Sequence, residues 1–519
     1  MDESLTNRPR RALHKIKSLD DLAEIVRQMQ KAGDTVVLCH GTFDLLHLGH
    51  VRHLQASRNE GTRLVVTVTA DAYVNKGPGR PVFSQMLRAE MLAAIEIVDY
   101  VAINEAPTAE NVLATVRPDI YVKGSDYRDD ANDVTGKIVA EREVIESYGG
   151  RVVFTDEATY SSSSLINKYL NLHEPSLQSR LNDLRDDNAL DRYLALVDKI
   201  ADYKVLIVGD TIVDEYQYVA AIGRSAKESM LATQFKNREV FAGGVIAAAN
   251  HLASFCREVE VVTAIGGYES YENMIRSSLR PNVKLSAVQR RDKPTTRKCR
   301  FVDTGYSVRK LFEVYVMDDS PLSDDNHKEF MDLLAAKVEG VDLVIVTDFG
   351  HGLMGPQAID LLIEKAPFLA VNAQSNSANH GFNLITKYRK ADYICIDEPE
   401  AQLAVHDKYA SSEAMATKLL PSAVDCPKIV VTQGKRGCTT FDRESGLNQM
   451  PALTSVIVDT VGAGDAFFVL TAPFVRAGAA MPDVGLLGNA AGAIKVGIIG
   501  HRSSVEKVAY VKFLTALLK

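Results

Sequence analysis

Residues 35–50 of the 519-residue chain read TVVLCHGTFDLLHLGH, and this stretch decides the fold of the first half. The apolar run Thr35–Cys39 is typical of a short strand that is buried on both faces of a sheet. Gly41 allows the backbone to approach a ligand closely, and a helix is expected from about His50. A buried strand that passes through a glycine turn into a helix is the opening unit of an α/β sheet.

The same alternation continues on both sides of this stretch. Ser18 is expected to cap a helix that Gly33 closes, and residues 88–97 are expected to form another helix. Further strands are expected at residues 63–69, 99–103, 119–122 and 151–154. Strands that alternate with helices predict a Rossmann-like α/β domain over residues 18–172, whose parallel sheet is covered by helices on both faces.

A second α/β domain is expected from residue 203 to residue 519. Residues 173–202 are polar and charged, and they predict a partly helical linker. A new buried strand at 205–209 then opens the second domain, which at 317 residues is long enough to bury a core of its own. Its other strands are expected at residues 258–263, 343–347, 368–371, 393–396 and 428–432.

Composition excludes several classes of protein. With 46% hydrophobic and 24% charged residues, the chain has the composition of a soluble globular protein. A net charge of −8 argues against nucleic acid as a partner, because phosphate binding needs a basic surface. We find no apolar run near the roughly 18 residues of a membrane span, and no secretory signal at the start. Six scattered cysteines without a C-x-x-C pair favour reduced thiols, so a cytoplasmic protein with no membrane partner is expected.

His47 and His50 stand three residues apart, where the strand passes into the helix. At a helix start they share one face with unpaired backbone N–H groups, which attract anions. Imidazoles in this place can donate hydrogen bonds to phosphate oxygens as charge develops during displacement at an α-phosphate. The alternative is a pair of histidines with no chemical role. Serines 161–164 form a later hydroxyl-rich turn, which either cradles phosphate or only caps a helix.

Together these motifs resemble the cytidylyltransferase type of the nucleotidyltransferase superfamily over residues 18–172, and within it the adenylyltransferase of ADP-heptose synthesis. The closer match rests on GTFDLLHLGH at 41–50 and on VKGSDY at 122–127, where the family has Gly-Gly-Asp-Tyr. The resemblance implies that His47 and His50 stabilise the transition state. It implies a nucleotide site of Gly41, Thr42, Phe43 and Lys123, with Lys76 and Arg88 neutralising phosphates and Ser162 and Ser163 holding the triphosphate. ATP is favoured as the nucleotide, but no residue is identified that reads the base, so CTP stays open.

The second half carries a glycine turn of its own, Asp459-Thr-Val-Gly-Ala-Gly-Asp465, before an apolar helical stretch. Its glycines let consecutive N–H groups converge on an anion at a helix N-terminus. Asp465 lies where a carboxylate can take the proton of an attacking hydroxyl, as phosphoryl transfer requires. A simple turn is the alternative interpretation.

The complete string resembles the ribokinase-type sugar kinase family, whose other motifs follow in order over residues 203–519. The resemblance implies that Asp465 is the catalytic base and that the N–H groups of Gly462, Ala463 and Gly464 stabilise the transferring phosphoryl group. It implies a sugar site of Asp210, Asp214, Gly243 and Gly244, and an ATP site that includes Thr432, Gly434, Gly437 and Asn489. Mg²⁺ is the implied cofactor, organised indirectly by Asp397 and Glu400. Members of the family often pair through a lid, which implies a homodimer.

Three positions depart from the family pattern. Ala247 stands where the family has an asparagine, for which Asn250 on the same helix face is a candidate substitute. Asp397 replaces the asparagine of an N-x-x-E motif and keeps an oxygen that can hold a metal-bound water. Asn372-Ala-Gln374 replaces Asp-Pro-Lys and so removes a cation from the sugar-phosphate region. These changes leave the ATP chemistry intact and leave the identity of the sugar open.

Both halves together resemble the bifunctional heptose kinase and adenylyltransferase of bacterial ADP-heptose synthesis, with the usual domain order reversed. The resemblance implies ATP-dependent phosphorylation of a heptose phosphate, or a related sugar, at C1. Nucleotidyl transfer to a sugar 1-phosphate would then give ADP-heptose and pyrophosphate. The expected partners are small-molecule sugar phosphates and nucleotides. Two alternatives stay open, namely synthesis of a CDP-linked sugar or polyol, and a kinase-like domain that only binds sugar or mediates dimerisation.

Overall fold

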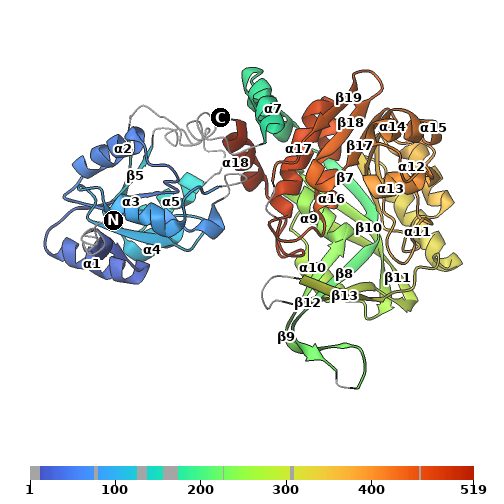
Figure 1. Cartoon of the computed structure of the whole chain (residues 1–519), viewed down its shortest axis with the longest axis horizontal. Coiled ribbons are helices and arrows are strands. Elements are labelled where there is room, and N and C mark those ends of the chain that lie inside the picture. The colour runs from blue at the N-terminus through green and yellow to red at the C-terminus, as the bar shows by residue number, and fades with distance from the viewer. Residues whose placement is uncertain are drawn as a thin grey trace. The chain divides into compact units, whose positions relative to one another are not determined.

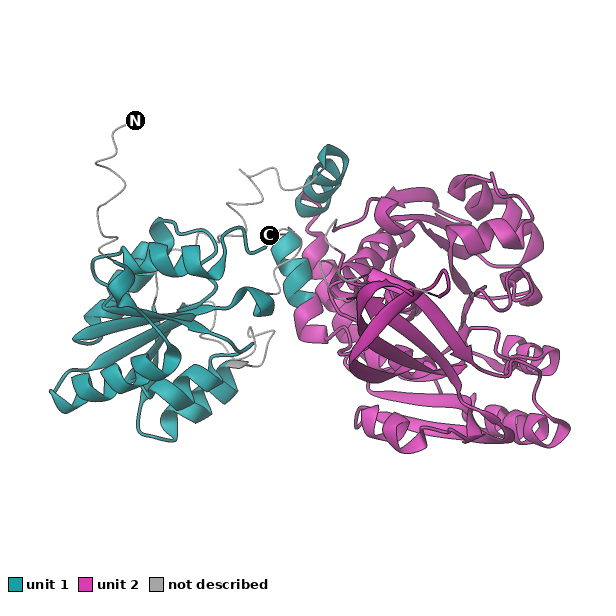
Figure 2. Cartoon of the chain, turned by 60° about the horizontal axis from the view of Figure 1, so that its bottom comes forward, with its two compact units in different colours: residues 1–185, 511–519 teal, residues 186–510 magenta. Residues whose placement is uncertain are grey.

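In a computed structural model the chain forms two compact units, residues 1–185 with 511–519 and residues 186–510 (Figure 2). The structure describes residues 12–74, 80–124, 137–155, 174–225, 227–303, 309–454 and 457–518. The boundary between the units falls within the predicted linker, which holds helices α7 (Pro175–Asp186) and α8 (Ala189–Ile200). Helix α8 packs in the second unit, where the Tyr193 hydroxyl donates to the carboxylate of Asp483 at 2.8 Å.

Among the described residues the first unit has a six-stranded parallel sheet in the order β1-β4-β3-β2-β5-β6 (Figure 1). The strands are β1 (Ile16–Lys17), β2 (Val36–Gly41), β3 (Arg63–Thr69), β4 (Tyr100–Asn104), β5 (Ile120–Gly124) and β6 (Arg151–Thr155). The helices are α1 (Leu19–Lys31), α2 (Leu48–Asn59), α3 (Gln85–Ala93), α4 (Glu110–Val116) and α5 (Lys137–Glu146).

Both faces of this sheet are buried. Val37 of β2 packs in a cluster with Leu54 of α2, whereas its neighbour Val36 packs with Leu22 of α1. Successive residues of a strand point to opposite faces, so β2 lies between two apolar layers. The predicted parallel sheet with helices on both faces is therefore confirmed.

Two predicted helices have different outcomes. Ser18 caps α1 as predicted, because its hydroxyl accepts a hydrogen bond from the Asp21 amide at 3.1 Å. The helix predicted at 88–97 begins three residues earlier, as α3. Its first amide, that of Gln85, donates to the Asp71 carboxylate at 3.0 Å, and a side-chain partner of this kind allows a helix to begin.

Within the described residues the second unit has a nine-stranded sheet in the order β11-β10-β7-β14-β15-β16-β17-β18-β19. The strands from β11 to β17 run parallel, and β18 and β19 continue antiparallel. The strands are β7 (Lys204–Gly209), β10 (Glu258–Tyr268), β11 (Val283–Pro294), β14 (Leu343–Asp348), β15 (Leu369–Ala373), β16 (Tyr393–Asp397), β17 (Lys428–Thr432), β18 (Cys438–Asp442) and β19 (Gly446–Met450).

Helices surround this sheet. They are α9 (Val245–Ala253), α10 (Glu272–Ser278), α11 (Asp324–Lys337), α12 (Pro356–Lys365), α13 (Glu398–Ala404), α14 (Ser412–Ala414), α15 (Leu420–Ala423), α16 (Ala463–Arg476) and α17 (Met481–Lys495). Helix α18 (Lys507–Leu518) begins in this unit, and its residues from Val511 onward belong to the first. The six strands predicted for this half coincide with β7, β10, β14, β15, β16 and β17.

A second sheet in this unit was not predicted. We call it the small sheet, and its order is β13-β12-β8-β9, with β8 (Thr211–Arg224), β9 (Leu231–Gly244), β12 (Thr296–Asp303) and β13 (Arg309–Val316). Polar and charged residues interrupt the apolar ones along these strands, and several large apolar side chains are exposed, among them Ile222 and Phe235. The sheet is mixed, with β12 parallel to β8 and the two outer pairs antiparallel. Its strands are partly exposed to water, so they lack the continuous apolar runs on which the prediction rested.

Two further predictions concern the cysteines and the membrane. All six cysteines lie within the described residues, and each is buried and free. In the part of the chain that the structure describes, we find no helix with both the length and the apolar character of a membrane span.

Candidate active sites

The predicted nucleotide residues of the first unit lie where the strand order of the sheet reverses. From β2 the chain builds outward to β3 and β4 on one side and to β5 and β6 on the other. Open α/β sheets bind ligands outside the carboxyl ends of the strands at such a point. Gly41 ends β2 and is followed by Thr42 and Phe43, while Lys123 lies near the end of the neighbouring strand β5. The structure therefore brings these four predicted residues to the same edge of the sheet.

His47 is the N-cap of α2, and its ring is oriented by the backbone. Its Nδ1 accepts a hydrogen bond from the Gly49 amide at 3.1 Å, which leaves the ring proton on Nε2. Nε2 is buried and has no hydrogen-bond partner among the described residues. Burial lowers the pKa of His47, so the ring is neutral near pH 7. An N–H donor at the start of a helix is thus free to receive an anion.

His50 lies beside His47, with 4.1 Å between the ring centroids. Its other aromatic neighbour is Phe43, at 5.3 Å between centroids. Phe43 has a φ of 48°, in the left-handed region, and it is buried. A Cβ on Gly41 would lie 3.1 Å from the Phe43 ring, so glycine allows this ring to pack closely against the backbone. The two predicted histidines are therefore held together by the loop that follows β2.

Arg88 has a different role from the predicted one. Its guanidinium is fully buried and donates to the carbonyl oxygens of Thr42, Thr69 and Phe83 at 2.5, 2.9 and 2.9 Å. It also forms an ion pair of 2.6 Å with Asp71. Four of the five N–H donors of Arg88 are thus used within the protein, and its guanidinium holds the Thr42 loop in place.

Of the four other predicted residues of this site, the structure describes only Lys123. The ammonium of Lys123 forms an ion pair of 2.8 Å with Glu141, which neutralises part of its charge. Lys76, Ser162 and Ser163 lie outside the described residues.

The strand order of the second unit reverses between β7 and β14. Asp210 follows β7, and Asp348 ends β14. The Asp210 carboxylate accepts N–H groups of Phe349 at 3.0 Å and of His351 at 3.3 Å. Burial and the neighbouring Asp348 raise the pKa of Asp210 to about 6. The predicted sugar residue thus lies at the position where this fold class binds ligands.

The other predicted sugar residues lie next to Asp210. A Cβ on Gly244, whose φ is 56°, would collide with the Asp210 carbonyl, and one on Gly243 would collide with the Asp214 carboxylate. Only glycine permits both contacts. His501 lies 3.2 Å from Asp214. Although burial acts in the other direction, hydrogen bonds from His501 and Arg300 lower the pKa of Asp214, which is therefore an anion.

Asp465 lies in the first turn of α16, directly after the predicted glycine turn. Gly462 is the N-cap, with a φ of 75° that favours glycine, and Ala463 and Gly464 begin the helix. The Asp465 carboxylate accepts a hydrogen bond of 2.5 Å from the side-chain amide of Gln374. Burial raises the pKa of Asp465 above its usual value. The Ala463 amide donates to the Thr460 carbonyl at 3.3 Å. A carboxylate held in the first turn of a helix, where the helix dipole favours anions, suits phosphoryl transfer.

His501 connects the sugar side of this site with the glycine turn. It contacts Asp214 on one side, and a Cβ on Gly462 would lie 2.9 Å from its ring. The charge of His501 also acts on the pKa of Asp465. Asp214 and the glycine turn that precedes Asp465 therefore both lie against one histidine, which the sequence did not mark.

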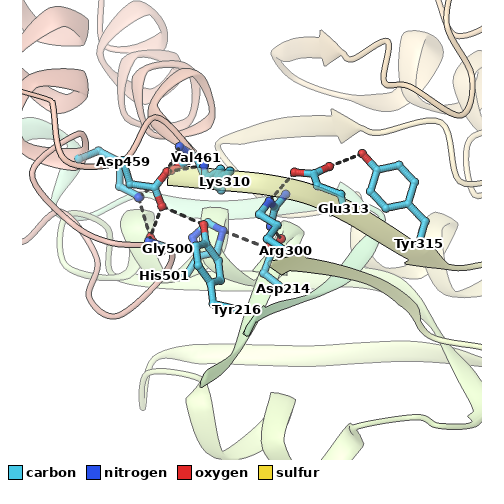
Figure 3. A network of polar contacts seen from close by, with 11 residues as sticks. Asp214, Tyr216, Arg300, Lys310, Glu313, Tyr315, Asp459, Val461, Gly500 and His501 are labelled. Atoms are coloured by element: carbon cyan, nitrogen blue, oxygen red, sulfur yellow. Dashed lines mark hydrogen bonds and ion pairs between the residues drawn. The ribbon is translucent and has the colours of Figure 1, made fainter. Parts of the chain in front are cut away.

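Figure 3 shows how the small sheet reaches this site. Asp459, which opens the glycine string, accepts hydrogen bonds from the Lys310 ammonium at 2.7 Å, the Tyr216 hydroxyl at 2.8 Å and the Gly500 amide at 2.9 Å. Although burial opposes it, the Lys310 contact lowers the pKa of Asp459 to about 2. Arg300 of β12 bonds both Asp214 and Glu313. Sequence reasoning missed these partners because each lies far along the chain from the residue it contacts.

The predicted ATP residues lie on the β17–β18 turn and on α17. Thr432 ends β17, and Gly434 and Gly437 have φ values of 55° and 96°, which allow the turn. The side-chain amide of Asn489 donates to the carbonyls of Met450 at 3.1 Å and Pro451 at 2.9 Å. Both of its N–H groups therefore hold the backbone after β19.

The predicted metal residues form a helix cap. Asp397 caps α13 by accepting the Glu400 amide at 2.8 Å, and Glu400 in turn accepts the Ser375 amide at 3.1 Å. Burial and the neighbouring Asp397 raise the pKa of Glu400 to about 9. A cation nearby would favour the ionised carboxylate and lower this pKa. Among the described residues no group of three or more His, Cys, Asp and Glu side chains can hold a metal. Two carboxylates fit Mg²⁺ only where water and phosphate supply the other ligands.

Asn250 does not replace the asparagine that is missing at Ala247. Its side-chain amide donates to the Ser278 carbonyl at 3.0 Å, and its oxygen accepts the Arg280 amide at 3.2 Å. The amide thus ties α9 to the end of α10 and to Arg280 beyond it, which corrects the expectation that Asn250 substitutes for the missing asparagine.

Comparisons with known proteins match both units. The family model "Cytidylyltransferase-like" matches residues 38–168, and "pfkB family carbohydrate kinase" matches residues 202–508. The chain is 39% identical over 163 residues to "Bifunctional protein HldE" of Syntrophotalea carbinolica, which covers 31% of this chain and 32% of that protein. It is 42% identical over 161 residues to the protein of the same name from Geobacter sulfurreducens, covering 30% and 31%. The matched segments thus span about a third of the length of these relatives.

Solved structures resemble the chain at low identity. Phosphofructokinase-2 from Escherichia coli, in its tetrameric inhibited form, is 14% identical with a TM-score of 0.49, and covers 61% of this chain and 100% of that one. Ribokinase from Thermotoga maritima is 20% identical with a TM-score of 0.47, covering 60% and 99%. The predicted order, with the nucleotidyltransferase-like domain before the kinase domain, is confirmed by the two family models. The chain belongs to the pfkB family of carbohydrate kinases and carries a cytidylyltransferase-like domain ahead of its kinase domain.

Proposed function

We propose that the chain is a bifunctional enzyme that activates a sugar in two steps. The kinase unit phosphorylates a heptose phosphate, or a related sugar, at C1 with ATP. The first unit joins AMP from ATP to the sugar 1-phosphate, giving ADP-heptose and pyrophosphate. The proposal is supported by the two family matches and by the similarity to proteins named bifunctional HldE.

One observation carries the kinase half of the proposal, namely the convergence of Asp214, Gly462 and Asp465 around His501. In the proposed reaction Asp214 and Asp210 bind hydroxyls of the sugar, and Asp465 takes the proton of the hydroxyl that attacks. The N–H groups of residues 462–464 stabilise the charge on the transferring phosphoryl group. A raised pKa makes Asp465 a stronger base than an exposed aspartate.

The adenylyl half rests on the orientation of His47. The Gly49 amide fixes its tautomer, and the Nε2–H is buried without a partner among the described residues. We propose that this N–H donates to an α-phosphate oxygen as negative charge develops on it, and that His50 acts beside it. Lys76, Ser162 and Ser163 remain predicted phosphate contacts. ATP is the proposed nucleotide, with CTP as the alternative outcome.

Mg²⁺ is proposed as the cofactor of the kinase unit. When bound, it neutralises charge on the phosphates of ATP. Asp397 and Glu400 would hold it through water, in keeping with their two carboxylates and with the raised pKa of Glu400.

Residues 18–172 and 203–519 act as the two catalytic domains, with residues 173–202 between them. The enzyme acts as a homodimer, its partners are small-molecule sugar phosphates and nucleotides, and it works in the cytoplasm.

Mass spectrometry of the products tests this function. The full-length protein is incubated with a panel of heptose and hexose phosphates, and with ATP or CTP, in the presence of Mg²⁺. We expect a sugar bisphosphate from the kinase step and an ADP-sugar with pyrophosphate from a supplied sugar 1-phosphate. Formation of a CDP-sugar in place of an ADP-sugar would show that the first unit uses CTP rather than ATP. Binding of a sugar without phosphorylation of any panel member would reduce the kinase domain to a sugar-binding module.

A further inference from the structure

The ammonium of Lys495 is buried beside the glycine turn of the kinase unit. Lys495 is the last residue of α17, and its side chain is fully buried. Its Nζ donates to the carbonyl of Val461 at 2.7 Å and to that of Gly500 at 2.7 Å. Val461 belongs to the string that carries the base, and Gly500 precedes His501. One ammonium therefore joins the two loops that meet at the site.

Burial makes the charged form of Lys495 less favourable than it is in water. Burial lowers its pKa, and the carboxylates of Asp459, Asp465 and Asp214 act in the opposite direction. A buried cation with two carbonyl partners costs more solvation than an apolar side chain of similar size would. Fold stability alone therefore does not explain a lysine at this position.

The stem of Lys495 also packs against the glycine turn. A Cβ on Gly462 would lie 3.3 Å from Lys495 Cε and 2.9 Å from the His501 ring. The side chain thus lies beneath the residue at which α16 begins. A change in its position would move the N–H groups of residues 462–464 relative to His501.

We propose that Lys495 is a positioning residue for phosphoryl transfer. By holding the carbonyls of Val461 and Gly500, its ammonium keeps the glycine turn aimed at the phosphoryl group and keeps His501 against Asp214. This role rests on the proposed kinase function. It predicts a loss of kcat when the charge is removed, and recovery when a small cation enters the space that the side chain leaves.

Lys199 provides a matched control. Its Nζ donates to the carbonyl of Ala477 at 2.7 Å, and Ala477 is the C-cap of α16. It therefore binds the opposite end of the same helix through one ammonium–carbonyl hydrogen bond, from an exposed side chain. A general loosening of α16 would affect both variants, whereas loss of the loop contact would affect only the Lys495 variants.

The experiment compares Lys495→Ala, Lys495→Met and Lys199→Ala in the full-length protein. Sugar-dependent formation of ADP is measured with the panel sugar that the wild type turns over fastest. We expect kcat to fall by about 10²-fold in both Lys495 variants, with KM for the sugar changing by less than about threefold. Ammonium or methylamine should restore Lys495→Ala by about tenfold or more, but not Lys495→Met, whose side chain fills the space. Choline at equal ionic strength is too large to enter and controls for salt.

A second measurement does not depend on a substrate. The amides of Val461 and Gly500 both donate to Asp459, at 3.2 and 2.9 Å, so their hydrogen exchange reports whether the two loops are held. Exchange should be faster in Lys495→Met and unchanged in Lys199→Ala. If the wild type phosphorylates no sugar, the proposed function fails, while exchange still tests the contact.

The proposal is overturned by any of three results. One is a Lys495→Met protein with more than about a third of the wild-type kcat. Another is a folded Lys495→Ala protein that neither amine restores. The third is unchanged exchange at Val461 and Gly500 in Lys495→Met. Should Lys495→Ala not fold, kcat and exchange of the methionine variant decide.

Discussion

Replacing Asp465 by asparagine separates its proposed role as a base from its role in the structure. The hydrogen bond from Gln374 to Asp465 Oδ1 survives, because an amide oxygen also accepts. Asparagine has nearly the same size but cannot take a proton from the attacking hydroxyl. A positioned base is typically worth about 10²–10⁴-fold in rate, which corresponds to about 3–5 kcal/mol in the barrier. Sugar phosphorylation should fall by that factor, while the affinity for ATP changes little.

The direction of the stability change follows from the pKa. Burial raises the pKa of Asp465 in the folded state above its unfolded value, so its ionised form is less favourable in the fold than in water. At neutral pH the charge therefore costs stability, and Asp465→Asn should melt at the same temperature as the wild type or higher. Asp459→Asn provides the contrast. The Lys310 contact lowers its pKa to about 2, so its charge stabilises the fold above that pH and its loss should lower the melting temperature.

The assay is steady-state formation of ADP with the accepted sugar, accompanied by a thermal melt of each variant. Conversion of a supplied sugar 1-phosphate by the first unit serves as an internal control and should not change. More than about a tenth of the wild-type kcat in a folded Asp465→Asn protein would show that Asp465 is not the base. A large drop in the melting temperature of Asp465→Asn would instead show that the buried charge of Asp465 stabilises the fold.

Three further predictions follow from single contacts. His47→Ala should lower nucleotidyl transfer by about 10²-fold and leave kinase turnover unchanged, because it removes the Nε2–H donor; wild-type transfer would limit His47 to capping α2. Gln374→Ala removes a donor to the Asp465 carboxylate, so the pKa of Asp465 should rise further and the acid limb of the kinase pH profile should move to higher pH. Gln28→Ala, which loses a similar hydrogen bond to Glu24 in the first unit, is the control. If the acid limb of the pH profile does not move in Gln374→Ala, Gln374 does not lower the pKa of Asp465. Arg88→Ala should destabilise the first unit by about 3 kcal/mol, since three carbonyls lose the donor of a fully buried guanidinium, whereas exposed Arg52→Ala should not. A higher KM for ATP with unchanged melting would instead support a phosphate contact of Arg88.

The sheets could be predicted where a strand is buried on both faces. β3 and β17 begin and end at the predicted residues, because a continuous apolar run leaves few other structures open. The small sheet could not be found in the same way. Its strand β9, LATQFKNREVFAGG, carries charged residues on an exposed face, and its pairing with β8 is a contact between segments rather than a property of either.

In the candidate sites, local sequence motifs could be predicted, but contacts between distant residues could not. Glycine strings are visible in one sequence because glycine is required where backbone conformation or close approach excludes a side chain, as at Gly244 and Gly462. Partners such as Lys310 for Asp459 and Gln374 for Asp465 are separated by 149 and 91 residues, so no local pattern marks them. Arg88 shows the converse limit. The structure places it beside the Thr42 loop, and only its burial reveals that its donors hold backbone carbonyls.

The departure at Gln374 acquires a different meaning in the structure. From the sequence, the loss of a lysine from Asp-Pro-Lys removes a cation near the sugar. In the structure Gln374 contacts the base, so its substitution bears on proton transfer. Positive charge near the predicted sugar aspartates comes from Arg300, which bonds Asp214, and from buried Lys298, which interacts with Asp214 and Asp210. Lys387, outside the small sheet, also acts on Asp210. The missing lysine therefore changes the tuning of the base more than the charge around the sugar, and the pH profile of Gln374→Ala distinguishes these two effects.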